Sequence, residues 1–91
     1  MIDPRWVAVG YQQIAAFSTL QTLTVPTGAT AALIRVETTS VRWRDDGTAP
    51  TASVGQLMLT TDQPLWYPGV LTALQFIPTA STSTLDVTYY R

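Results

Sequence analysis

The chain has 91 residues, a formal net charge of −1 and 12% charged side chains, about half the share in typical soluble domains. It contains no Cys, His or Lys, which excludes disulfides, zinc and copper sites of the usual kind, Cys and Ser–His nucleophiles, and a Schiff-base lysine. We therefore expect no enzyme, no metal and no cofactor, and the scattered arginines argue against nucleic acid binding.

The length predicts one domain, residues 1–91, with residues 1–19 forming either a docking arm or the first strand. A chain this short buries only about 60–65% of its unfolded surface, so its stability is marginal. Small domains without disulfides or metals commonly gain stability from a partner subunit. The low charge points the same way, and we expect a homo-oligomer or a subunit that docks onto a larger body.

Short alternating segments separated by turn signals predict an all-β domain, a β-sandwich or jelly roll of seven or eight strands. The first segment has some helical character but is short and uncapped, and we assign it to a strand. The predicted strands are Tyr11–Phe17, Leu20–Val25, Ala32–Glu37, Val41–Arg44, Gln56–Thr60, Leu65–Tyr67, Leu71–Ile77 and Leu85–Tyr90.

The alternation also predicts which side chains share a face. Trp43, Phe76 and Tyr89 are assigned to the core. Within Gln56–Thr60, Leu57 and Leu59 lie on one side. The sequence Tyr67-Pro68-Gly69-Val70 has Pro and Gly where a type II turn places them.

The apolar face switches from even to odd positions between Ala32–Glu37 and Val41–Arg44, which one uninterrupted strand does not permit. A turn or bulge near residues 38–40 is therefore required. A two-residue hairpin sets Glu37 opposite Arg42, which is favourable, and Arg35 opposite Arg44, which is not. Because this segment lacks the Gly or Asn of tight hairpins, a bulge or a bend from one sheet to the other stays open.

The segment Val41–Pro50 holds four charged residues within five positions and is the candidate site for specific polar contacts: Arg42, Arg44, Asp45 and Asp46. Neighbouring carboxylates rarely span a glycosidic bond, so we interpret the aspartates as part of a turn. A calcium site at Asp45, Asp46 and Thr48 matches no known loop spacing. Trp66 and Tyr67 point to opposite faces of a strand, so one of them is expected outside, as an interface anchor or a sugar-stacking surface.

The N-terminal sequence Met1-Ile2-Asp3-Pro4 has no basic segment, and no apolar run is long enough for a signal peptide or a membrane span. We therefore expect a protein that is made in the cytoplasm and has no membrane partner.

Three segments resemble small all-β structural proteins of tailed bacteriophages, most closely capsid decoration (cement) proteins: Val25-Pro26-Thr27-Gly28-Ala29, Val41–Pro50 and Val87-Thr88-Tyr89-Tyr90-Arg91. The resemblance covers about Leu20 to Arg91. It implies a jelly-roll-like virion subunit on the capsid surface, often a trimer, that bridges copies of the major capsid protein and has no small-molecule substrate. The alternative is a carbohydrate- or receptor-binding β-module of a phage tail or fibre.

Overall fold

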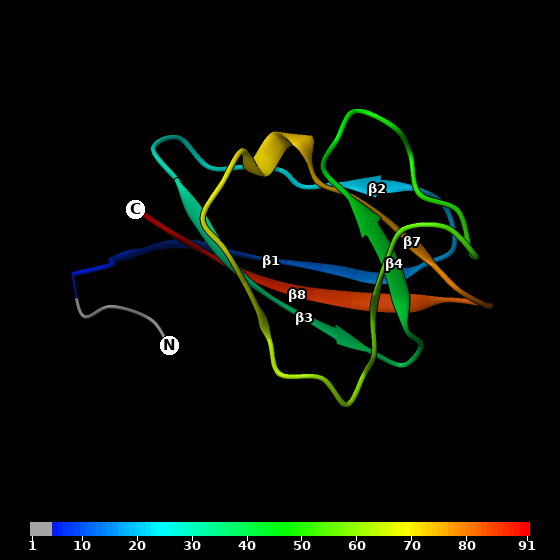
Figure 1. Ribbon diagram of the computed structural model, residues 1–91. Coiled ribbons are helices and arrows are strands. Elements are labelled where there is room, and N and C mark those ends of the chain that lie inside the picture. The colour runs from blue at the N-terminus through cyan, green and yellow to red at the C-terminus, as the bar shows by residue number, and fades with distance from the viewer. Residues whose placement is uncertain (1–4) are drawn as a thin grey trace.

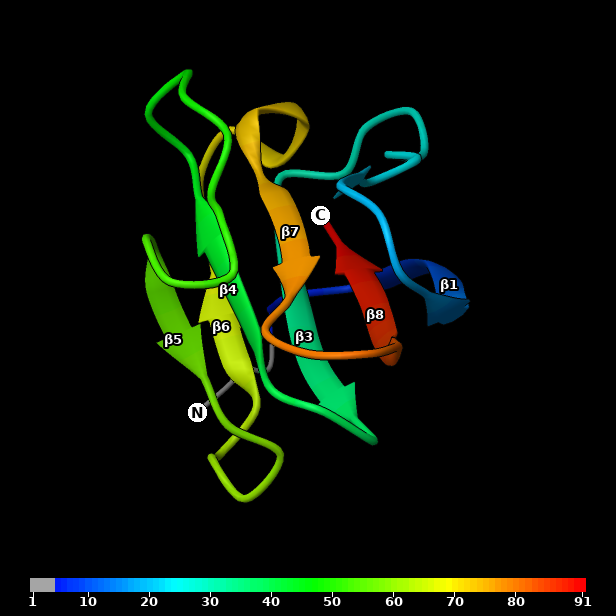
Figure 2. The ribbon, with the colours of Figure 1, turned by 90° about the vertical axis from the view of Figure 1, so that its right-hand side faces the viewer.

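The computed structural model describes residues 5–91, which form two four-stranded antiparallel sheets that pack face to face (Figures 1 and 2). The first sheet has the order β1-β8-β3-β6 and the second the order β2-β7-β4-β5. The strands are β1 (Ala8–Phe17), β2 (Gln21–Thr22), β3 (Ala31–Glu37), β4 (Val41–Arg44), β5 (Gln56–Met58), β6 (Leu65–Tyr67), β7 (Gln75–Pro78) and β8 (Ser83–Tyr90). The all-β prediction is confirmed, and the layers are those of a β-sandwich.

The strand pairing is nested. The first strand pairs with the eighth, the second with the seventh, the third with the sixth and the fourth with the fifth. The pairs β3–β8 and β4–β7 then complete the two sheets. The first half of the chain therefore runs antiparallel to the second half along its whole length.

The core lies between the sheets and follows the predicted alternation. On β8 the inward side chains of Leu85, Val87 and Tyr89 are buried, whereas Asp86, Thr88 and Tyr90 stand on the outer face. Phe76 is also buried, and Trp43 packs against the core from its rim. The hydroxyl of Tyr89 donates to Oε1 of Gln12 at 2.6 Å, which satisfies its buried polar end.

The chain crosses from the first sheet to the second between β3 and β4, so the hairpin between these segments is wrong and the bend between sheets is what forms. Arg35 lies opposite Asp86 on β8 rather than opposite Arg44, and Glu37 lies opposite Thr84 rather than Arg42. The break that the parity switch required is therefore a crossing between the sheets.

The bend is tight and strained. Thr38 has a φ of 78°, which a β-branched residue rarely adopts, and the amide of Thr39 donates to the carbonyl of Glu37 at 3.0 Å. Fully buried Ser83 holds the bend from the neighbouring strand, since its hydroxyl lies 2.8 Å from the carbonyl of Glu37 and 2.5 Å from that of Thr39.

Leu57 and Leu59 share a side as predicted, and they are 47% and 43% exposed while Met58 between them is buried. Two local predictions need correction. Leu71–Ile77 is not one strand, because Leu71–Ala73 form a 3₁₀ helix before β7. The type II turn is also wrong, because Gly69 does not have the positive φ that this turn requires. Instead, a Cβ at Gly69 would lie 2.9 Å from the ring of Tyr67, so the position needs glycine for space.

The described ends of the chain lie side by side. Residues 8–17 form the first strand rather than a free arm, whereas the part of the predicted arm at residues 1–4 lies outside the described residues. The amide of Val7 donates to the carbonyl of Arg91 at 3.0 Å, and the amide of Arg91 donates back at 2.9 Å. Among residues 5–91, no helix is long and apolar enough to cross a membrane.

Candidate functional site

Strand β4 positions the predicted polar site. Val41 is buried and Trp43 packs on the core, so Arg42 and Arg44 project from the outer face of the second sheet, as the alternation predicts. The chain then leaves β4 and enters the segment from Asp45 to Gly55, which returns it to β5.

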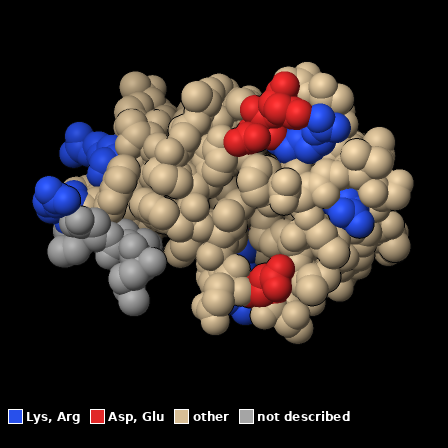
Figure 3. All heavy atoms as spheres, in the orientation of Figure 1, with Lys and Arg blue, Asp and Glu red and all other residues tan. Residues whose placement is uncertain are grey.

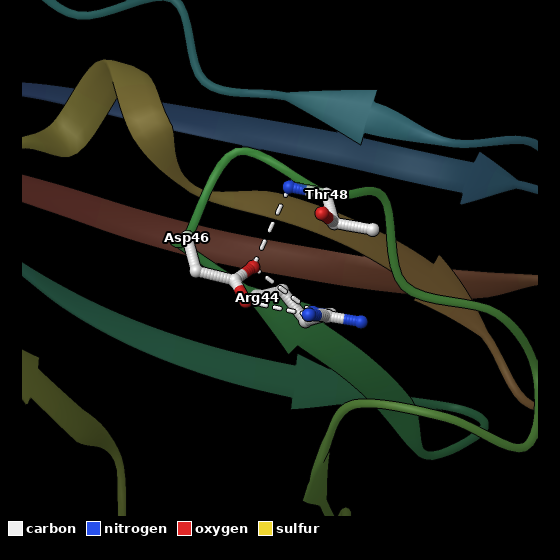
Figure 4. Close-up of polar contacts among 3 residues, drawn as sticks. All are labelled: Arg44, Asp46 and Thr48. Carbon is white, nitrogen blue, oxygen red and sulfur yellow. Dashed lines mark hydrogen bonds and ion pairs between the residues drawn. The ribbon is translucent and has the colours of Figure 1, made fainter.

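Arg44 and Asp46 form a two-pronged ion pair at the end of β4 (Figure 4). Nε of Arg44 donates to Oδ1 of Asp46 at 2.9 Å, and Nη2 donates to Oδ2 at 2.5 Å. The amide of Thr48 adds a longer bond of 3.4 Å to the same carboxylate, and Gly47 between them has a φ of 88°. The hydrogen bonds from Arg44 lower the pKa of Asp46, and Asp46 raises the pKa of Arg44. The pair is exposed, so its main effect is to fix the direction of the guanidinium.

Asp45 points to a different partner. The hydroxyl of Tyr67 donates to Oδ2 of Asp45 at 2.6 Å, which ties β6 of the first sheet to the loop after β4 of the second. The ring of Tyr67 meets that of Trp43 edge to face, with centroids 6.1 Å apart. The hydrogen bond to Asp45, with burial and the negative charge, raises the pKa of Tyr67 to about 12. The adjacent aspartates thus act separately, as turn residues.

Arg42 forms hydrogen bonds to the segment that joins β4 to β5. Its Nη1 donates to the carbonyl of Gly55 at 3.0 Å, and its Nε donates to the carbonyl of Ala52 at 3.3 Å. This guanidinium braces the segment between β4 and β5, so Arg44 is the arginine of β4 that is better placed to contact another molecule. Nη1 of Arg44 has no hydrogen-bond partner among residues 5–91.

Trp66 lies apart from the arginines, on the outer face of the first sheet. It contacts Trp6 and Tyr90, with ring centroids 5.3 Å apart in both pairs and ring planes inclined at 77° and 64°. As expected, one of the adjacent aromatics faces out and the other, Tyr67, faces the core. The inclined rings do not offer the coplanar surface on which a flat polysaccharide stacks.

The ion pair borders an open hollow of about 400 Å³, lined by Arg44, Asp45, Asp46, Val54, Gly55 and Gln56. Val54 in this lining is 53% exposed. Two more exposed apolar side chains lie on the same sheet, Leu57 opposite Arg42 and Leu59 just beyond β5. Sequence reasoning missed these three residues. The signal was the run Leu57-Met58-Leu59, in which three apolar neighbours on a strand cannot all point inward.

A second polar group lies on the outer face of the first sheet, away from β4. Oδ1 of Asp86 accepts hydrogen bonds from Tyr11 and from Gln13, each at 2.9 Å. Hydrogen bonding and charge repulsion from Asp86 raise the pKa of Glu37. Burial alone would raise the pKa of Asp86, but its hydrogen bonds and the nearby Arg35 hold it below its usual value.

Comparison of the chain with protein-family models, with curated proteins and with solved structures found no match.

Proposed function

We propose that this chain is a non-enzymatic structural protein of tailed bacteriophage virions, a capsid decoration protein with a jelly-roll fold. The nested pairing of β1 with β8, β2 with β7, β3 with β6 and β4 with β5 supports the jelly roll. This eight-stranded, two-sheet arrangement is frequent in viral capsid subunits. The resemblance of three sequence segments to decoration proteins supports the location on the capsid surface.

One observation carries the proposal. Half-exposed Val54 lines the same hollow as the charged pair of Arg44 and Asp46, whose geometry is fixed. Half-exposed Leu57 lies opposite Arg42 on β4, and Leu59 lies just beyond β5. Interfaces between proteins combine an apolar centre with a few oriented polar groups, and arginine is enriched in them. The chain carries few charges outside these groups, and the face drawn in Figure 3 is mostly uncharged, with the acidic and basic side chains in a few small clusters.

The mechanism is bridging. The protein binds the major capsid protein, and neighbouring copies of itself in a trimer, and so adds buried surface across the joints of the shell. A stable interface buries about 1,200–2,000 Å² in total. Many weak contacts on one shell reinforce each other, because each bound copy raises the effective concentration of the next contact.

Arg44→Ala tests the proposal. Truncating one member of a buried charged pair at an interface typically costs about 2–5 kcal/mol, so occupancy on undecorated capsids should fall by more than about tenfold at subsaturating protein. The pair is exposed in the isolated subunit, so far-UV circular dichroism and the unfolding midpoint should stay unchanged. Arg35→Ala, on the outer face of the other sheet, is the matched control and should bind like the parent protein.

The outcomes separate the contact residue from the function. Unchanged occupancy for Arg44→Ala, with loss for Leu57→Asp, would remove Arg44 from the interface and keep the apolar contact. No binding of the parent protein to undecorated capsids would refute the decoration role itself.

A further inference from the structure

A second hollow lies beside the edge strands β5 and β6, one from each sheet. Its volume is about 410 Å³, and residues of β4, β5, β6 and the segment that joins β5 to β6 line it. This volume falls within the roughly 300–1,000 Å³ range of small-molecule sites in proteins. It shares Gln56 with the hollow beside the ion pair, but Arg44, Asp45 and Asp46 do not line it.

The residues that line it include two tryptophans, Trp43 and Trp66, and three residues with planar polar side chains, Gln56, Asp62 and Gln63. Within residues 5–91, the indole N–H groups and the two amides form no hydrogen bond to the protein, and no buried side-chain polar atom lacks a partner. These donors and acceptors are therefore open to solvent and available to a ligand.

Asp62 is held in place before any ligand arrives. Its Oδ2 accepts the amide of Leu59 at 2.8 Å, and its own amide donates to the carbonyl of Leu59 at 3.1 Å. This turn fixes the carboxylate and leaves Oδ1 without a partner among the described residues. A preorganised acceptor loses little freedom on binding, which favours affinity at an otherwise open site.

We propose that this hollow binds a neutral saccharide, a role that goes beyond packing on a capsid and does not depend on it. A sugar hydroxyl both donates and accepts, which matches the paired donor and acceptor of a glutamine amide and the acceptor of a carboxylate. The apolar face of a sugar ring suits an indole surface. The described lining residues include no arginine, so the hollow has no cation with which to bind an anionic ligand.

Nuclear magnetic resonance of the ¹⁵N-labelled protein tests the proposal directly. The probes are glucose, galactose, N-acetylglucosamine, maltose, lactose and diacetylchitobiose, each titrated to about 50 mM, well above the ~1 mM dissociation constant of a weak site. The three tryptophans give three indole N–H signals. At least one sugar is expected to shift the signals of Trp43 and Trp66 along a saturating curve.

Gln63→Ala removes one amide from the hollow and should weaken that binding by about fivefold to tenfold, the effect of one or two hydrogen bonds. Gln75→Ala on β7, outside the hollow, is the matched control and should bind like the parent protein. The proposal is overturned if no sugar gives a saturating shift, or if Gln63→Ala binds as tightly as the parent. Capsid binding by the sugar-free protein reports on the decoration role separately.

Discussion

Ser83→Ala probes the bend that carries the chain from the first sheet to the second and so sets the position of β4. The Ser83 hydroxyl has one proton to share between the carbonyls of Glu37 and Thr39. After its removal the carbonyl of Glu37 keeps the amide of Thr39, but the carbonyl of Thr39 keeps no described partner. The loss of one hydrogen bond costs about 0.5–1.5 kcal/mol, and the unpaired acceptor adds part of its desolvation penalty. We therefore expect the free energy of unfolding to fall by about 1–2 kcal/mol.

Urea denaturation followed by tryptophan fluorescence measures this change as a shift in midpoint at constant slope. The melting temperature should fall by about 5–15 °C, given roughly 4–8 °C per kcal/mol in a domain of this size. Ser18→Ala, an exposed serine with no hydrogen bond to the described protein, is the control and should stay within about 0.5 kcal/mol. Equal stability of the Ser83 and Ser18 variants would show that the buried hydroxyl does not hold the bend.

Further predictions concern the same bend, two tyrosines and one glycine. Thr38→Gly should stabilise the protein to urea by about 1 kcal/mol, because glycine adopts the φ of 78° without strain; a destabilised variant would contradict this strain. Tyr67 and Tyr89 have pKa values raised from 10.0 to about 12, the first mainly by its bond to Asp45 and the second by burial. Since the folded pKa is the higher one, this contribution to stability is complete below pH 10.0 and disappears as the pH rises through about 12. Ultraviolet titration of the folded protein should show Tyr67 and Tyr89 ionising near pH 12, and Tyr67→Phe should have one fewer tyrosine ionising there; ionisation of both near pH 10.0 would refute it. Gly69→Ala should cost about 1 kcal/mol and lower the pKa of Tyr67, because the new methyl displaces the ring from Asp45. An unchanged pKa would mean that the ring stays in place.

The local faces of the strands were predictable because they depend only on neighbouring residues. Alternation on Leu85–Tyr90 and on Val41–Arg44 identified the buried side chains, and the parity switch at residues 38–40 required a break between β3 and β4. Which strands pair was not predictable, because the pairing joins distant positions such as Tyr11 and Thr88. Nothing in the local pattern around Glu37 distinguishes a hairpin from a crossing to the other sheet.

The residues of the candidate site were predictable from the sequence, but most of their hydrogen-bond partners were not. The charge density of Val41–Pro50 indicated the residues, and the ion pair between Arg44 and Asp46 is a contact two positions apart. The bond from Tyr67 to Asp45 joins residues 22 positions apart and depends on the packing of the two sheets, so the sequence carried no sign of it. Gly69 was noticed for its supposed turn, whereas its importance lies in the space that it leaves for Tyr67.

The reciprocal hydrogen bonds between Val7 and Arg91 have a consequence for engineering the protein. They place both described ends of the chain at one end of the sandwich, away from the loop that follows β4 (Figure 1). A cargo fused through a linker at either end would therefore leave the surface around Arg44 uncovered. The same closeness permits a circular permutant, in which a short linker joins the two ends and the chain is opened in the exposed turn at Ala80 and Ser81.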